Sequence, residues 1–269
     1  FICLFQTPVK SFPEVESPVL QAFSIAVSEA RMKEMSPRRQ WDYLAEVFTQ
    51  KFEDTEEADE WIFSHMNELA QKGRLPDSRQ LNELIENAYD SKCTVSAEWI
   101  ARFTLSSENA AHYEKSHGIA YAILLNHFES LQLVDSIEAY IPLLEAHLED
   151  HPDPLLQISL FSNMASVAHY RGDIFDAVVN YQKALALTDS QDTFNLFILN
   201  RNLASSYTNM DFIERAAHHA DRCIELFGID EIPMEYMVMF GTIKSNTFEF
   251  DEAEEFYQRA ISHACDMAL

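Results

Sequence analysis

The sequence predicts an all-α protein, built as an α-solenoid in which antiparallel helix pairs stack one after another. Three observations predict this fold. The 269-residue chain holds only 5 glycines, well below the roughly 7% of ordinary proteins. Apolar residues recur at three- and four-residue spacing along most of the chain, as one buried face of a helix requires. Small residues recur in step three times, which indicates repeated helix pairs.

The recurring small residues define the repeat. They form three sets: Ala165, Ala204 and Gly241 in the first helix of each pair, Ala177, Ala216 and Ala253 early in the second helix, and Ala184, Cys223 and Ala260 later in it. Each set steps by 39 and then 37 residues. Small side chains are needed where two helices approach closely, and an isolated pair cannot bury both of its faces. The pattern therefore predicts stacked pairs at about 155–190, 194–229 and 232–266.

Turn chemistry supports these boundaries. Gly172 is expected to take the left-handed conformation that ends a helix, and Asp173 to cap the helix that follows. Asp211, with Glu214 three residues later, resembles a capping box.

The stretch from Tyr170 to Leu187 resembles the tetratricopeptide repeat, because Ala177, Tyr181 and Ala184 occupy the expected positions after the turn. The resemblance implies a right-handed superhelix that binds proteins or peptides on its concave face. Some features depart from the family pattern. The terminal proline is absent, the tryptophan position holds other residues, and both steps exceed the usual 34 or so residues.

The resemblance covers residues 155–269 and extends over 117–150, which reads as two helices split near 131–135 with Pro142 in the second. We therefore assign 111–269 to tetratricopeptide-like repeats and 1–110 to an N-terminal helical region. Its four amphipathic segments are either degenerate helix pairs or a separate bundle, and we favour degenerate pairs.

Charge and composition exclude several classes of function. The net charge is −25, from 44 acidic and 19 basic residues, so nucleic acids and anionic membranes are poor partners. The four cysteines are far apart, which fits reduced thiols in a cytoplasmic protein. No apolar run approaches the roughly 20 residues that span a bilayer. The chain begins without Met and stops inside a helical pattern, so we expect a fragment or excised domain.

The sequence contains no motif of a known enzyme class. His147 and His151 are four residues apart and could share a helix face with a metal, but the general base of the HExxH motif is missing and Pro152 is expected to end that helix. His219 and Cys223 have the same spacing, and we interpret them as packing residues. We interpret the acidic run at 53–60 as the solvent-exposed face of a helix. We predict no enzyme activity, no cofactor and no metal in this chain.

Ligand contacts are expected on the first helix of each pair, on the face turned away from the second helix. The candidate residues are mostly polar: Asn163, Ser166, His169, Tyr170, Arg201, Asn202, Ser205, Asn209, Thr242 and Asn246. Asn163 and Asn202 are equivalent in the repeat, so they could form an amide ladder along a peptide backbone, with Arg201 as an anion contact. The alternative is that these residues are ordinary exposed polar side chains.

We therefore predict a non-catalytic module that binds a protein or peptide. The resemblance extends to the tetratricopeptide-like regions that precede the effector of bacterial signalling proteins such as diguanylate cyclases, which implies a sensory or regulatory input module. Two alternatives stay open: a peptide-pheromone-sensing regulator, and a helical metalloenzyme that uses His147 and His151. Self-association into a homodimer also stays open.

Overall fold

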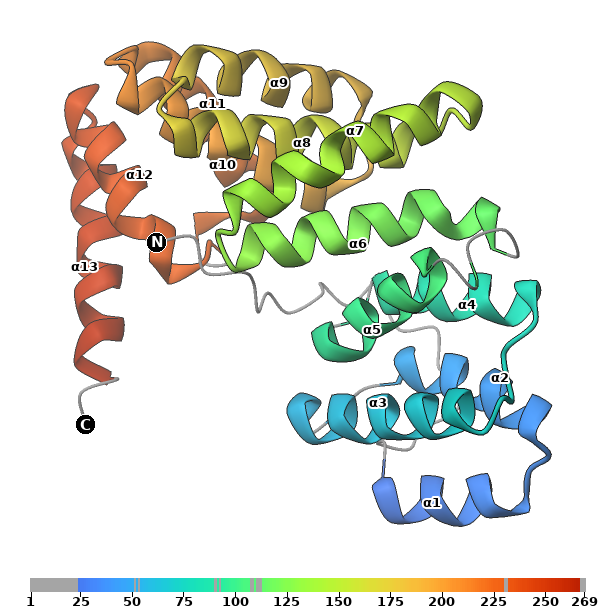
Figure 1. Ribbon diagram of the computed structural model, residues 1–269. Coiled ribbons are helices and arrows are strands. Elements are labelled where there is room, and N and C mark those ends of the chain that lie inside the picture. Colours follow the sequence, from blue (N-terminus) through green and yellow to red (C-terminus); the bar gives the residue numbers. More distant parts are fainter. Residues whose placement is uncertain are drawn as a thin grey trace. The chain divides into compact units, whose positions relative to one another are not determined.

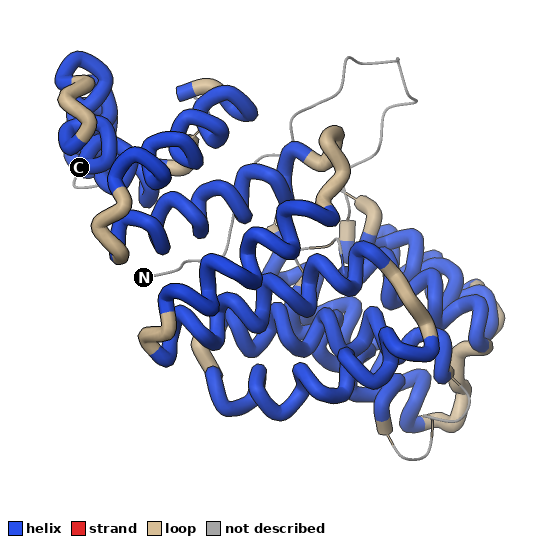
Figure 2. The backbone as a smooth tube through the Cα atoms, turned by 90° about the horizontal axis from the view of Figure 1, so that it is seen from above, coloured by secondary structure: helices blue, strands red, loops and turns tan. Residues whose placement is uncertain are grey.

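The part of the chain that the structure describes folds into thirteen α-helices and contains no strand. Figures 1 and 2 show how these helices follow one another. This computed structural model describes residues 24–266, except 51, 53, 90, 92, 107–108, 110–112 and 230–231. It confirms the predicted all-α fold. The described residues up to Asp150 form one compact unit, and the described residues from His151 onward form a second. The division into 1–110 and 111–269 that the repeat pattern suggests stays a prediction.

The first unit contains seven α-helices within its described residues. They are α1 (Ile25–Glu34), α2 (Pro37–Phe48), α3 (Thr55–Gln71), α4 (Ser78–Tyr89), α5 (Thr94–Leu105), α6 (His117–Ser130) and α7 (Val134–Asp150). Helix α2 packs on α4, α3 packs on α5, and α6 packs on both α5 and α7. A short 3₁₀ helix, η2 (Glu114–Ser116), leads into α6. The predicted split between α6 and α7 is confirmed.

Two of the three tryptophans anchor the core of this unit. Trp41 is 1% exposed, and its indole N–H donates to the carbonyl of Arg74 at 2.7 Å. Trp61 is also buried, whereas Trp99 is only half-buried and stacks on Phe103 with 5.1 Å between ring centroids. Trp41 and Trp61 therefore contribute large apolar surfaces to the core, and the N–H of Trp41 has an acceptor there.

The acidic run at 53–60 does not lie entirely on a solvated face. Glu56, Glu57 and Glu60 are exposed, but Asp59 is buried. Its carboxylate accepts the backbone N–H groups of Val95 and Ser96 at 2.8 and 2.9 Å. Asp59 thus satisfies the free N–H groups at the start of α5, a position that the dipole of that helix also favours.

The second unit consists of three antiparallel pairs, and each pair has a first and a second helix. They are α8 (Pro154–Arg171) with α9 (Ile174–Leu187), α10 (Thr193–Asn209) with α11 (Ile213–Phe227), and α12 (Met234–Asn246) with α13 (Phe250–Asp266). Successive pairs meet where α9 packs on α10 and α11 packs on α12. This arrangement confirms the stacked pairs that the small residues predict.

The small residues lie at the helix contacts, as the register requires. Ala165, Ala177, Ala184, Ala204 and Ala216 are fully buried. In the third pair a methyl group added to Gly241 would stand 2.8 Å from the ring of Tyr257 on α13. A glycine there lets the larger Tyr257 fill the position that Ala220 occupies in the second pair.

One turn geometry repeats after the first helix of each pair. Gly172, Asp211 and Phe248 have positive φ angles of 85°, 61° and 66°, and Gln132, between α6 and α7, has 55°. In each turn the following residue donates its N–H to a carbonyl five residues back, as Asp173 does to Ala168 at 2.8 Å. This is the Schellman arrangement, which satisfies the last carbonyls of a helix.

The turn corrects the role predicted for Asp211. Asp211 does not cap α11, which begins after Phe212 and has no side-chain cap. It is the equivalent of Gly172, 39 residues further along the chain, and it ends α10 in the left-handed region that aspartate tolerates better than most residues. The predictions for Gly172 and Asp173 are confirmed, because the Asp173 carboxylate accepts the N–H of Asp176 at 3.3 Å.

Candidate functional site

The ten predicted site residues lie on α8, α10 and α12, the first helices of the three pairs. They differ in accessibility. Asn209, Thr242 and Asn246 are exposed, and His169, Tyr170, Asn202 and Ser205 are half-buried. Asn163, Ser166 and Arg201 are buried. A ligand on this surface would therefore meet mainly the side chains of α10 and α12.

Arg201 and Asn202 form the most ordered polar group on this surface. The Arg201 Nε and Nη2 atoms donate to the Asn202 Oδ1 atom at 3.0 and 2.6 Å. Nη1 donates to the hydroxyl of Tyr236 on α12, and the guanidinium carbon lies 4.6 Å from the centroid of that ring. Because donors of the guanidinium are used within the protein and its side chain is buried, Arg201 fixes the orientation of Asn202 and joins two pairs.

Asn163 and Ser166 form contacts with neighbouring helix atoms. The Asn163 amide donates to the Ser159 carbonyl of the same helix at 2.9 Å. The Ser166 hydroxyl lies 3.3 Å from that of Tyr181 on α9. Its equivalent in the third pair, Thr242, accepts from Tyr257 at 3.2 Å. The hydroxyls at this position therefore connect the two helices of a pair.

His169 is a predicted site residue whose pKa differs from that of a free histidine. Burial lowers its pKa, because the charged imidazolium loses its hydration near the end of α8. His169 is therefore neutral near pH 7 and can offer one hydrogen-bond donor and one acceptor.

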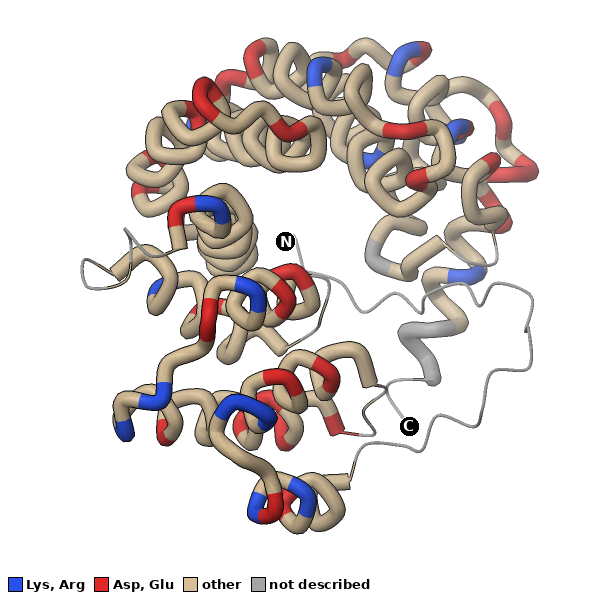
Figure 3. The backbone as a smooth tube through the Cα atoms, turned by 90° about the vertical axis from the view of Figure 1, so that its right-hand side faces the viewer, with Lys and Arg blue, Asp and Glu red and all other residues tan. Residues whose placement is uncertain are grey.

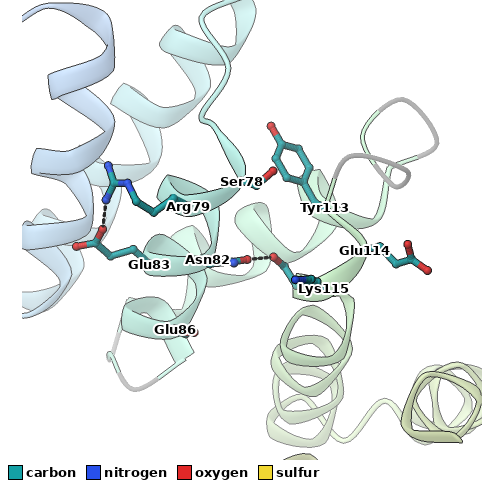
Figure 4. Close-up of a pocket in the computed structure, with 9 residues that line it drawn as sticks. Ser78, Arg79, Asn82, Glu83, Glu86, Tyr113, Glu114 and Lys115 are labelled. Carbon is teal, nitrogen blue, oxygen red and sulfur yellow. Dashed lines mark hydrogen bonds and ion pairs between the residues drawn. The ribbon is translucent and has the colours of Figure 1, made fainter. Parts of the chain in front are cut away.

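A separate depression of about 730 Å³ lies in the first unit, between α4 and the segment that contains η2 (Figure 4). Several of its polar side chains bind one another or neighbouring residues. Arg79 forms ion pairs with Glu83 at 2.8 Å and Asp42 at 2.6 Å, Ser116 bonds to Asn82, and the Tyr113 hydroxyl donates to the Pro76 carbonyl at 2.7 Å. The charges are of both signs, so the lining selects no single class of ligand.

Lys244, near the end of α12, is the most buried ammonium group among the described residues of the second unit, with 4% of its side chain exposed. Its Nζ lies 2.6 Å from Asp221 on α11 and 2.8 Å from both Glu249 and Glu252. Burial opposes the charge, but hydrogen bonds to the three carboxylates outweigh it and raise the pKa of Lys244. This cluster holds α11, α12 and α13 together.

His219 and Cys223 are packing residues, as their register predicts. His219 stacks on Tyr207 with 5.5 Å between ring centroids, and its Nδ1 lies 2.8 Å from the Asn200 Oδ1. Burial lowers the pKa of His219 to about 4 and raises that of Cys223 to about 12. The Cys223 thiol therefore stays protonated and unreactive.

No group of three or more His, Cys, Asp or Glu side chains in the described part of the chain is arranged to hold a metal ion. Helix α7 ends at Asp150, so His147 is on the helix and His151 is outside it. The His147 ring lies 6.5 Å from that of Tyr121 in an edge-on contact. A further histidine of this region, His112, is outside the described residues.

Two residues near the candidate surface, Tyr236 and Lys244, are difficult to identify from the sequence. Tyr236 is not among the predicted site residues, although its ring and its hydroxyl contact Arg201 of the preceding pair. Lys244 belongs to no motif. The sequence feature that could indicate a role for Lys244 is the presence of two acidic residues nearby, because Glu249 and Glu252 follow within eight residues.

The helix packing defines the described part of the chain as an all-α protein whose second unit is a stack of antiparallel helix pairs. Among solved structures it is similar to the crystal structure of BtubC (BKLC) from P. vanneervenii, with a TM-score of 0.52 and 15% sequence identity. The similarity covers 87% of this chain and 93% of that one. At this identity the likeness concerns the fold alone.

No family model matches the chain, and no curated protein sequence matches it. None of the helices in the described ranges is long and apolar enough to cross a membrane. Acidic residues are distributed over the helices of both units, and basic residues are fewer (Figure 3).

Proposed function

We propose that this chain is a non-catalytic module whose second unit binds a peptide or an extended protein segment along α8, α10 and α12. The observation that carries the proposal is the accessible polar surface on the first helices of stacked tetratricopeptide-like pairs. Its members include Asn202, Ser205, Asn209, Thr242 and Asn246.

The polar groups on this surface suit a peptide backbone. An amide side chain both donates and accepts hydrogen bonds, as each backbone unit of a peptide does. The Asn202 Oδ1 atom is held by Arg201, so its amide nitrogen is presented in a fixed orientation. A preoriented donor loses less conformational entropy when a ligand binds.

Charge limits the choice of ligand. The chain carries a net charge of −25, so acidic peptides are repelled and neutral or basic ones are favoured. Arg201 is buried and donates to Asn202 and Tyr236, so it orients Asn202 instead of contacting a peptide carboxylate.

Peptide display followed by calorimetry tests this proposal. Replacing Asn202 by Ala should weaken the best peptide about tenfold, because a hydrogen bond to a preoriented amide contributes about 1.4 kcal/mol. Gln258→Ala is the matched control, since Gln258 is an exposed amide on α13, the second helix of its pair. Equal affinity in both variants, or no peptide above background, would contradict the proposal.

A finer proposal is that this module is the regulatory input of a larger signalling protein, for which only the resemblance of the repeats to bacterial signalling proteins gives support. The natural full-length polypeptide tests it. The peptide that binds α10 and α12 should change the activity of an effector domain on the same polypeptide, and Asn202→Ala should abolish the change. A full-length product without an effector would contradict this form of the proposal but not peptide binding.

A further inference from the structure

Four phenylalanine rings stand exposed at the turns between the first and second helices of the pairs in the second unit. Phe175 follows the turn between α8 and α9 and is 65% exposed, and Phe212, between α10 and α11, is 47% exposed. Phe248 and Phe250 border the turn between α12 and α13 and are 79% and 61% exposed. We call these four residues the turn edge. Single exposed apolar residues are common, but several large rings at equivalent turns are not.

The repeat places these rings along one edge of the unit. Phe175, Phe212, Phe248 and Phe250 all lie within the first four positions from the left-handed residue of their turn. Since the pairs stack in sequence order, the turns that follow α8, α10 and α12 gather at the same edge (Figure 1). Neighbouring packed helices are about 8–10 Å apart, so one extended segment or helix can span several of these turns.

The backbone at Phe248 is unfavourable for its residue type. Its φ angle of 66° is in the left-handed region, where glycine or asparagine is usual and a bulky residue is an outlier. The ring gains little from packing, since it is mostly exposed and its described ring contact is with Phe250 at 6.0 Å. Folding of the chain therefore does not explain why an aromatic residue stands at this turn, and an unexplained strain of this kind points toward function.

Acidic residues lie within two positions of these rings in the sequence. Asp173 and Asp176 flank Phe175, Asp211 and Glu214 flank Phe212, and Asp251 follows Phe250. Arg215 is the basic residue beside Phe212, and its guanidinium carbon lies 5.9 Å from the centroid of that ring. A ring at this edge therefore already accepts a guanidinium group on its face, in an environment rich in carboxylates.

We propose that the turn edge binds a partner protein through a segment that carries both arginine and large apolar side chains. The apolar side chains pack between the rings, while the guanidinium groups stack on them and pair with the neighbouring carboxylates. This surface is distinct from the polar face of α8, α10 and α12, so the chain presents two binding surfaces. The occupant of the turn edge is specified by charge complementarity, since an acidic segment would be repelled.

Fluorescence anisotropy with the whole chain and three labelled peptides tests the proposal. The first peptide is an amphipathic helix of arginine and leucine, the second replaces each arginine by glutamate, and the third replaces each leucine by serine. At physiological salt the first should bind at least about tenfold more tightly than the other two, a difference of about 1.4 kcal/mol. Equal binding of all three would overturn the proposal.

Substitutions at the turn edge, compared with substitutions on α8 and α12, test where the arginine-leucine peptide binds. Phe248→Gly combined with Phe250→Ser should weaken the arginine-leucine peptide at least about tenfold, a difference of about 1.4 kcal/mol. The matched control is Leu155→Ser with Val238→Ser, which removes exposed apolar side chains from α8 and α12 and should leave the affinity unchanged. Unchanged affinity in the Phe variant, or equal losses in both, would overturn the proposal.

Two further measurements distinguish binding at the turn edge from misfolding and from binding at the polar face. The Phe248→Gly variant alone should also weaken the arginine-leucine peptide and should melt at a higher temperature than the natural chain, so its loss of binding cannot be attributed to misfolding. Asn202→Ala should not affect binding of the arginine-leucine peptide, and an equal loss in that variant would assign the peptide to the polar face of α10 and overturn the proposal. Sedimentation that shows a dimer held together by Phe248 and Phe250, without peptide binding, would identify a second copy as the occupant and overturn it as well.

Discussion

The guanidinium group of Arg201 on α10 lies over the ring of Tyr236 on α12, with 4.6 Å between its central carbon and the ring centroid. The two residues belong to successive helix pairs, and Arg201 also donates to the Tyr236 hydroxyl. A buried cation is favourable only when its charge and donors are matched. The contact therefore stabilises the stack and at the same time orients Asn202 on the candidate surface.

Replacing Arg201 by Ala should lower the free energy of unfolding by about 1–3 kcal/mol, because it removes a buried cation–π contact and several hydrogen bonds. Urea denaturation measures this loss. Tyr236→Phe is the control that keeps the ring and removes only the hydroxyl, so it should cost less than Arg201→Ala. A larger loss in Tyr236→Phe would contradict the view that the ring face carries part of the interaction.

Replacing Ala177 by Leu should destabilise the second unit by about 1–3 kcal/mol, because the residue is fully buried where α8 and α9 meet and the core has no space for a larger side chain. Thermal and urea denaturation measure the change. Ala186→Leu, at an exposed position of the same helix, is the matched control and should have little effect. An unchanged stability in Ala177→Leu would contradict the repeat register.

Replacing Phe248 by Gly should raise the free energy of unfolding by about 1 kcal/mol. The φ angle of 66° costs a side chain with a Cβ atom about that much, and the exposed ring gives little in return. Differential scanning calorimetry measures the shift. The opposite change at the equivalent turn, Gly172→Ala, should lower stability, and a gain there would show that the left-handed turns are not strained.

The stability of the second unit should fall as the pH is lowered from about 6.5 to about 4. Burial lowers the pKa of His219 in the folded state to about 4, whereas an unfolded histidine titrates near 6.5. The unfolded chain binds the proton first, so the contribution of His219 is complete above pH 6.5 and is lost as the pH falls through 4.

Measuring the difference between the natural chain and a His219→Gln variant isolates this effect from the titration of the many carboxylates. Denaturation curves at several pH values should show the two proteins converging in stability as the pH falls from about 6.5 to about 4. A difference that stays constant across this range would show that His219 is not buried in its neutral form.

The repeat of the second unit could be predicted from the sequence because small residues are required where helices approach closely. Ala165, Ala177 and Ala204 recur in register, and the structure places each at such a contact. In the first unit the sequence does not predict α5. Asp59 of α3 caps the start of α5. Because Asp59 is distant from α5 in the sequence, the residues next to the start of α5 give no indication of this cap.

The candidate surface was less predictable than the fold. The repeat register indicates which residues lie on the first helices. The contacts of their side chains, which the register does not predict, determine which of these residues are exposed to solvent. Arg201 was expected to be an anion contact, and its donors are directed to Asn202 and Tyr236.

The cluster around Lys244 has a consequence for how the second unit opens. Each repeat of such an array contacts only its neighbours, so a single repeat can open locally. Lys244 joins Asp221 of the preceding pair to Glu249 and Glu252 of its own pair, so α12 and α13 cannot fray without exposing an ammonium group and breaking three ion pairs. Amide protons of α12 should therefore exchange with solvent only when the neighbouring pair also opens, and the last two pairs should behave as one cooperative block.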